Sequence, residues 1–193
     1  MNDIIQQWHS AFLKTVQQHE NSIVLKESAL KERLSHWTTA LTSVVVATCE
    51  TIGWRASAKG HLLEMLPVHR SEYLALDVMA FADSNKRWRF PVAVMELENS
   101  KNNDLIAYSL WKVLCVRADL RIVFCYRKTS EESSTLIGSL RDEVIQAMAL
   151  SGRITLHGET LVVVGSHDDS ATFPYKFFKW WQLDKNTGTF HLI

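Results

Sequence analysis

Three carboxylic acids lie in or beside apolar stretches in the middle third of the chain. Asp77 is followed by the run Val-Met-Ala-Phe-Ala, and Glu96 and Glu98 interrupt the end of a second apolar run. Side chains alternate across a β-strand, so Glu96 and Glu98 would share one face. Carboxylates in such strands cost free energy to desolvate, and they repel one another unless a cation or a proton compensates. The acids therefore predict a site for a hard divalent ion, which would polarise a phosphoryl group and activate water.

The hydrophobic pattern predicts the elements that would position these acids. Apolar stretches between polar turns are typical of strands, whereas apolar residues three and four apart are typical of helices. Turn residues at 83–86 predict an antiparallel hairpin that would bring Asp77 beside Glu96. In chain order, the predicted elements are a helix over 36–51, strands over 61–66, 73–82 and 90–98, a helix over 103–117 and a strand over 120–126.

Further elements flank this central block. Two amphipathic helices are predicted before it, and a helix, a strand and a C-terminal hairpin with its turn at 186–188 are predicted after it. The helices and the strand are predicted over 4–16, 23–34, 133–150 and 160–165. We therefore expect an N-terminal helical extension over 1–36 and one domain over 37–193.

The chain resembles the PD-(D/E)XK nuclease superfamily in two respects. Its predicted elements follow the order helix, three strands, helix, strand, and Asp77 is followed by Glu96-Leu97-Glu98. The resemblance covers residues 37–127 and implies an α/β fold with a restriction-endonuclease-like core, in which helices flank a mixed central sheet. It implies that Asp77 and Glu96 bind Mg²⁺ or Mn²⁺, and that residue 98 positions or deprotonates the attacking water. Glu98 stands where Lys is usual, although some restriction endonucleases with Glu there remain active.

The string Glu96-Leu97-Glu98-Asn99 also resembles nuclease-like bacterial proteins that carry an E-x-E-N element. The three acids have an interpretation without a metal as well. In that interpretation, Glu98 and Asn99 flank the end of the strand in solvent, and Asp77 is hydrogen-bonded in a turn.

The resemblance makes two further residues candidates. Family members often carry a Glu on the helix before the first strand, so Glu50 would complete the metal shell, with Glu64 or Glu72 as alternatives. Some members hold a displaced catalytic lysine on the helix after the third strand, where Lys112 would contact phosphate. Each residue also has a simpler interpretation. Glu50 would be solvated near a helix end, and Lys112 would be a surface lysine favoured by the helix dipole.

Other sites have weaker support in the sequence. The aromatic stretch 177–181 has the residue types that stack on bases, but strand alternation favours its packing in the core. The histidines show no metal-ligand spacing, which argues against zinc. The sequence has no Gly-rich phosphate loop, dinucleotide fingerprint or nucleophile elbow, so these enzyme classes are excluded.

Composition limits the partners and the compartment. Lys plus Arg equals Asp plus Glu at 21 each, so no long-range positive field attracts a polyanion, and binding of nucleic acid, DNA above all, must be local. The three cysteines lack CxxC spacing, which predicts buried reduced thiols. The sequence begins without an export signal and has no membrane-spanning apolar run. We therefore expect a cytoplasmic protein with no membrane contact.

Two functions fit these patterns. The first is a Mg²⁺-dependent endonuclease, with Asp77 and Glu96 as metal ligands, Glu98 as a ligand or water-orienting base, and Lys112 as a phosphate contact. The second is a nuclease-like fold without catalysis, which serves as a binding or assembly module and docks a partner chain or a second copy through its N-terminal helices. Neutral charge and the missing motif lysine favour the second. The cost of keeping three acids in apolar strands favours the first, which we prefer.

Overall fold

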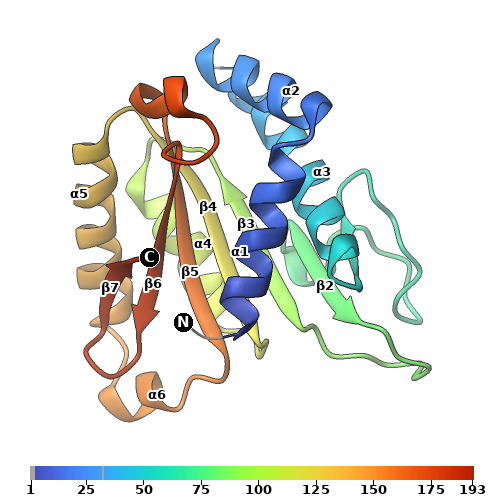
Figure 1. The fold of residues 1–193 in the computed structure, drawn as a ribbon. Helices are drawn as coiled ribbons and strands as arrows, with labels where there is room; N and C mark the ends of the chain where they lie inside the picture. The colour runs from blue at the N-terminus through green and yellow to red at the C-terminus, as the bar shows by residue number, and fades with distance from the viewer. Residues whose placement is uncertain (1–2, 32) are drawn as a thin grey trace.

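The structure, a computed structural model, describes residues 3–31 and 33–193. Residues 1, 2 and 32, which belong to the predicted N-terminal extension, lie outside the described residues. In the described chain, one mixed sheet of seven strands forms the centre, and its strands follow one another in chain order (Figure 1). Helices pack on both faces of the sheet. The prediction of an α/β fold with a mixed central sheet is confirmed.

The sheet is parallel in its centre and antiparallel toward both edges. Its parallel pairs are β3 with β4 and β4 with β5, where the chain crosses over through helices. The strands are β1 (Trp54–Ala58), β2 (Val78–Ala82), β3 (Ala93–Glu98), β4 (Leu120–Arg127), β5 (Glu159–Ser166), β6 (Phe178–Asp184) and β7 (Thr189–Leu192). Both predicted hairpins, β2 with β3 and β6 with β7, are confirmed.

Two of the helices begin at residues whose side chains cap them. Asn102 accepts a hydrogen bond from the Asp104 N–H at the start of α4, and Thr129 forms a capping box with Glu132 at the start of α5. The helices are α1 (Asp3–Val16), α2 (His19–Leu30), α3 (Leu34–Thr51), α4 (Asn103–Leu114), α5 (Ser130–Leu140) and α6 (Leu150–Ile154). The helix expected over 133–150 is therefore shorter, and it continues as a π-helical turn over Arg141–Ile145.

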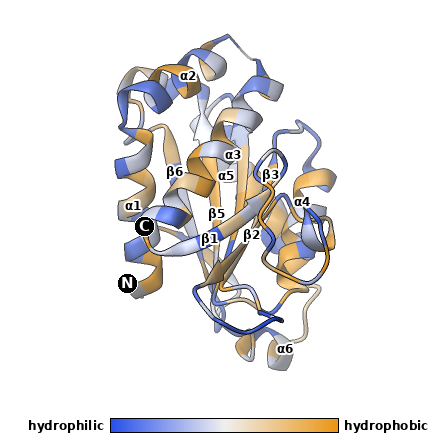
Figure 2. Ribbon diagram, turned by 90° about the vertical axis from the view of Figure 1, so that its right-hand side faces the viewer, coloured by the Kyte–Doolittle hydropathy of each residue, from blue (hydrophilic) through white to orange (hydrophobic). Residues whose placement is uncertain are grey.

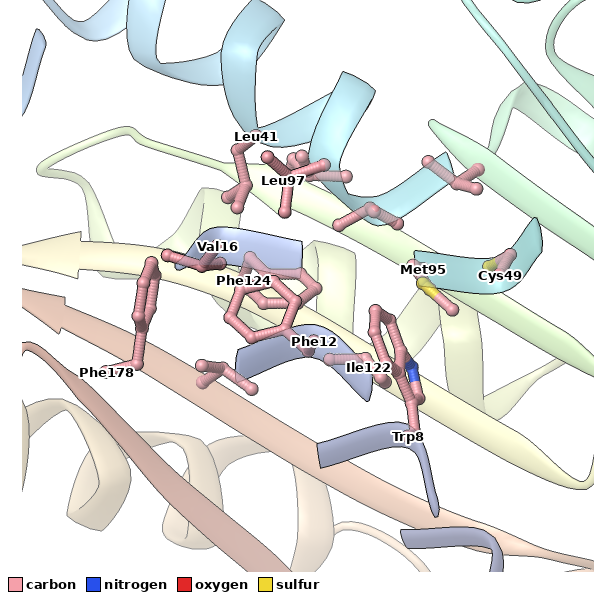
Figure 3. Packing of buried hydrophobic residues seen from close by; sticks show 14 of the residues in the cluster. Trp8, Phe12, Val16, Leu41, Cys49, Met95, Leu97, Ile122, Phe124 and Phe178 are labelled. Atoms are coloured by element: carbon pink, nitrogen blue, oxygen red, sulfur yellow. The ribbon is translucent and has the colours of Figure 1, made fainter. Parts of the chain in front are cut away.

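Helices α1 and α3 cover one face of the sheet and bury their apolar side chains against it. Trp8 and Phe12 of α1 are completely buried, and their rings lie 6.5 and 5.4 Å from the ring of Phe124 in β4 (Figure 3). In the predicted N-terminal extension over 1–36, the described helices α1 and α2 thus pack in the same core as the sheet. The amphipathic pattern of this extension revealed an apolar face, but it did not reveal that this face packs on the chain's own sheet.

Helices α4 and α5 cover the opposite face. Ile106 and Leu110 of α4 and Leu136 of α5 pack in a second cluster with Val94 and Val123 of the sheet. The central strands are thus buried on both sides, and Figure 2 shows mostly hydrophobic residues along β5. The three acids that were predicted to form the site lie on this second face.

The first strand lies at Trp54–Ala58 rather than over 61–66. Leu62 is 59% exposed, and the segment after β1 pairs with it only through a single bridge between Ala58 and His61. β1 is an edge strand whose buried side chains are small, namely Ala56, Ser57 and Ala58. Small residues give little hydrophobic periodicity, so the more apolar segment downstream was wrongly assigned as the strand.

Two further findings concern the exposure of the cysteines and the length and apolar content of the helices. Cys49 and Cys125 are buried free thiols as expected, but Cys115, which follows α4, is exposed. Among the helices of residues 3–31 and 33–193, none is both long enough and apolar enough to cross a lipid bilayer.

Candidate active site

Asp77 and Glu96 face each other at the open end of the β2–β3 hairpin, away from the loop that connects the two strands. Val78 lies opposite Met95 in this antiparallel pair, so the next position outward places Asp77 opposite Glu96. The Asp77 N–H donates to Glu96 Oε1 at 3.3 Å, and the Leu97 N–H donates to Asp77 Oδ2 at 2.7 Å. Asp77 precedes β2 rather than lying within it. The predicted juxtaposition of the two acids is confirmed.

Lys112 reaches this pair from α4. Its Nζ lies 2.8 Å from Glu96 Oε2, and the Ser109 hydroxyl donates to the same oxygen at 3.3 Å. The side chain of Lys112 is 21% exposed and that of Glu96 only 5%. The interpretation of Lys112 as an ordinary surface lysine is therefore wrong, because its ammonium is directed inward at a buried carboxylate.

The chain before Asp77 supplies a second anchor for Lys112. Leu74 and Ala75 both have left-handed backbone conformations, with φ of 57° and 55°. Such conformations cost about 1–2 kcal/mol for residues with a Cβ. The turn that they form presents the Ala75 carbonyl to Lys112 Nζ at 2.7 Å. The ammonium is thus held between a carbonyl and a carboxylate, at a place where the backbone is strained.

The pKa of Glu96 is raised from 4.5 to about 7. Burial is the main cause, and the nearby charge of Asp77 raises the pKa further. The hydrogen bond and charge of Lys112 lower the pKa, but they do not offset the burial. Glu96 is therefore poised between its acid and its carboxylate near neutral pH, which is the behaviour expected of a group in an active site.

Glu98 does not join this cluster as expected. It is half-buried, and its Oε1 accepts a hydrogen bond from the Ser100 N–H at 2.8 Å, so it caps the turn that follows β3. For Glu98, the interpretation as a strand-end capping residue is thus correct. Across the described residues, no three His, Cys, Asp or Glu side chains are grouped so that they could hold a metal ion. The predicted three-acid constellation is therefore reduced to a pair.

Glu50 is also absent from the cluster. The start of α3 lies near the end of β3, since Asn99 donates a hydrogen bond to Thr38. Glu50 lies twelve residues after Thr38 on the same helix, about 18 Å along the axis at 1.5 Å per residue, and it is exposed. Its expected role in the metal shell is therefore wrong. The alternatives Glu64 and Glu72 are exposed as well.

Sequence reasoning missed two members of the site. Ser109 lies one helical turn before Lys112, and residues three apart share a helix face, so this spacing was an available signal. The Ala75 carbonyl had no signal, because a main-chain acceptor in a left-handed turn carries no mark of residue type. Both groups act through contacts that depend on how α4 packs on the hairpin.

A cavity of about 610 Å³ opens at the carboxyl ends of β3 and β4. Its lining includes three cationic side chains and two acidic ones, namely Lys101, Arg127, Lys128, Glu131 and Glu132. Arg127 is buried and fixed, because it donates to the carbonyls of Ser100 and Tyr126 and to the side chain of Asn103. β3 ends two residues after Glu96, so the cavity and the acids lie at the same end of the sheet.

These features define an α/β protein with a buried lysine–carboxylate cluster and, at the same end of the sheet, a cavity lined by both cationic and acidic side chains. No protein-family model matches the sequence, no curated protein matches it, and no solved structure matches the fold.

Proposed function

We propose that this chain is a metal-dependent, endonuclease-like protein that hydrolyses phosphodiester bonds of nucleic acid, with Asp77, Glu96 and Lys112 as its active-site residues. The contact between Lys112 Nζ and the buried Glu96 carboxylate, beside Asp77, carries this proposal. Replacing a buried ion pair by apolar residues is often neutral or stabilising, so such a pair is weak evidence for a purely structural role. A buried pair with a pKa shifted to neutrality favours chemistry.

The donor set of this cluster suits Mg²⁺ or Mn²⁺. Mg²⁺ is usually bound by one or two carboxylates together with water and substrate phosphate, rather than by a full cage of protein ligands. Asp77 and Glu96 supply two carboxylates, and the Leu97 N–H occupies only one oxygen of Asp77. A bound ion would supply charge neutralisation at the phosphoryl group and a more acidic water. Glu96 must lose its proton to bind metal, so its pKa of about 7 predicts stronger metal binding above neutral pH.

Lys112 takes the part that the PD-(D/E)XK resemblance assigns to residue 98. Glu98 is engaged with the Ser100 N–H, whereas Lys112 contacts the acid that would bind the metal. The Ala75 carbonyl and Glu96 fix the ammonium, and its partial exposure leaves room for a phosphate oxygen. We infer that Lys112 neutralises charge on the phosphate and orients the attacking water, in place of the missing motif lysine.

The element order and the cavity support the same proposal. A restriction-endonuclease-like core, as the resemblance implies it, has the order helix, three strands, helix, strand. The same order occurs here in α3, β1, β2, β3, α4 and β4. Ligands of open α/β sheets bind outside the carboxyl ends of the strands, where this cavity opens. Lys101 and Lys128, which share this lining with Glu131 and Glu132, would contact phosphates beside the cleaved bond.

The test is cleavage of supercoiled plasmid, single-stranded DNA and RNA with Mg²⁺ or Mn²⁺. Wild type should cleave at least one of these substrates. Asp77→Asn, Glu96→Gln and Lys112→Met should each lower the rate by about a hundred-fold, as expected when a group that stabilises transition-state charge is removed. Lys112→Arg should restore part of the rate, and Glu98→Gln should keep most of it.

The matched control is a second lysine–carboxylate pair, Lys179 with Asp169. Its N–O distance is 2.9 Å, and Lys179 is 20% exposed, so it resembles the active-site pair in both respects. Lys179→Met and Asp169→Asn should leave the cleavage rate near that of wild type. Wild-type inactivity on all three substrates with both metals would contradict the proposal, as would equal losses in the control variants.

One observation favours a second candidate, a nuclease-like module that binds without cleaving. Both oxygens of Glu96 already have internal partners, namely the Asp77 N–H on one and Ser109 and Lys112 on the other. In that case Mg²⁺ should leave the melting temperature unchanged. A protein partner would use surfaces other than the buried face of α1, for example Ile23 and Val24 of α2, which are 44% and 50% exposed.

A further inference from the structure

The connection between β2 and β3 combines cations with exposed aromatic rings. It contains the consecutive residues Lys86, Arg87, Trp88, Arg89 and Phe90, and it projects from the end of the hairpin (Figure 1). Trp88 is 61% exposed and Phe90 is 88% exposed. Two large exposed rings within one short loop are grouped apolar surface, and such grouping is typical of sites that contact another molecule.

The same loop is a local basic patch in a chain of zero net charge. Three cations and no acid lie between Asp83 and Glu96 in the sequence. Lys86 and Arg87 are exposed. Arg89 Nε donates to the Lys86 carbonyl at 3.2 Å, which folds the loop on itself, while its Nη1 is buried without a hydrogen-bond partner in the described chain. The loop therefore presents two exposed cations beside its rings, together with Arg89, whose buried Nη1 lacks a partner.

We propose that residues 86–90 bind single-stranded nucleic acid, with the cations on phosphates and the rings of Trp88 and Phe90 stacked on bases. Proteins that bind single strands combine positive charge along the backbone with aromatic side chains on which bases stack. As an anchor for substrate, the loop rests on the function proposed above, although binding by itself requires no cleavage.

The arrangement of the loop favours nucleic acid over a lipid surface. Helical and lipid-interface anchors place apolar side chains together and keep the cations at the rim. Here Trp88 has Arg87 and Arg89 on either side, so rings and cations alternate as bases and phosphates do in a nucleic acid. The loop lies beyond the opposite end of β2 from Asp77, and β2 itself spans about 13 Å over the four steps from Val78 to Ala82, so a bound strand would run along the hairpin from the loop to the site. A strand of a few nucleotides held at the loop would reach Asp77.

The test is binding of a fluorescent oligodeoxythymidine, measured by anisotropy in EDTA over a series of salt concentrations. Trp88→Ala with Phe90→Ala should weaken binding by about ten-fold to a hundred-fold through lost stacking. Arg87→Ser with Arg89→Ser should weaken it too, and should lower the slope of log affinity against log salt by about 1.4, as expected for two phosphate contacts on a single strand. Tyr175→Ser with Lys176→Ser is the matched control, because both residues are exposed, and it should bind like wild type.

EDTA separates this inference from the proposed function, because no metal-dependent step contributes to the measurement. If the loop variants keep their melting temperatures and lose binding, the inference stands even when no variant cleaves any substrate. Loop variants that bind like wild type would overturn it, even if the protein proves to be a nuclease. Binding to vesicles of phosphatidylserine and phosphatidylcholine without binding to the oligonucleotide would also overturn it.

Discussion

Two clusters in this protein contain the same kinds of side chain and differ in burial. In each, a lysine contacts a carboxylate at 2.8 or 2.9 Å, and a serine hydroxyl donates to that carboxylate at 3.3 Å. The carboxylate side chain is 5% exposed in the first cluster and 29% exposed in the second. The candidate-site cluster consists of Lys112, Glu96 and Ser109, and the control cluster of Lys179, Asp169 and Ser130.

The two carboxylates have pKa values shifted in opposite directions. The hydrogen bond from Lys179 is the main influence on Asp169 and lowers its pKa. Burial is the main influence on Glu96 and raises its pKa to about 7, although Lys112 lies just as close. The distance of the cation therefore does not decide the charge state. Desolvation by the helix and sheet around the carboxylate decides it.

Removal of the two lysines should have the most unequal effects. Lys112→Met leaves the buried Glu96 without its cation, so we expect a loss of about 4 kcal/mol in the free energy of unfolding at pH 9. Lys179→Met breaks a more exposed pair and should cost less than about 1 kcal/mol. Urea unfolding of both variants measures the difference. Equal losses would show that burial does not distinguish the clusters.

The second-largest difference between the two clusters should be in how the free energy of unfolding depends on pH. The folded-state pKa of Glu96, about 7, exceeds its ordinary value of 4.5, so the folded protein binds more protons than the unfolded chain between these values. Its contribution is therefore lost as pH rises, by about 3 kcal/mol from pH 4.5 to pH 8. Glu96→Gln should remove this decline, as measured by urea unfolding across that range.

Asp169 provides the opposite case. Its lowered pKa gives stability that is present above its ordinary value of 3.8 and lost only as the pH falls below that value. Asp169→Asn should therefore leave the slope between pH 5 and pH 8 as in wild type. A slope that persists in Glu96→Gln would assign the pH dependence to another group.

Removal of the two serine hydroxyls should give the smallest difference in the free energy of unfolding between the clusters. Ser109→Ala removes a hydrogen bond to a buried carboxylate, so we expect a loss of about 1–2 kcal/mol at pH 8 and a further rise in the pKa of Glu96. Ser130→Ala removes the corresponding bond at a more exposed carboxylate, where water replaces it, and should cost under about 0.5 kcal/mol. Urea unfolding at pH 8 measures both losses. A larger loss for Ser130→Ala would contradict the comparison.

Much of the site could be predicted from local patterns. Alternation and turn residues predicted the β2–β3 hairpin, and the hairpin register then brought Asp77 beside Glu96. Helical spacing predicted α4, which carries Lys112. These features depend on neighbours within a few residues or across one turn, where backbone geometry leaves few alternatives.

Other features could not be predicted because they depend on packing between distant segments. The apolar face of α1 was visible, but only the tertiary structure shows that it covers β4 rather than a partner. Glu98 and Glu96 share a strand face by alternation, yet Glu98 turns to the Ser100 N–H at the end of the sheet. Glu50 was placed by analogy, but α3 packs on the face of the sheet opposite to α4, and Glu50 is exposed.

The sequence by itself determined the α/β class, the hairpin and the pairing of Asp77 with Glu96, because periodicity and turn chemistry act over short distances. Only the tertiary structure decided which cation faces Glu96 and how deeply that carboxylate is buried. Both follow from the packing of α4 on the sheet, which excludes water from Glu96 and directs Lys112 at it. Desolvation depends on all the surrounding atoms together, so no local pattern encodes it.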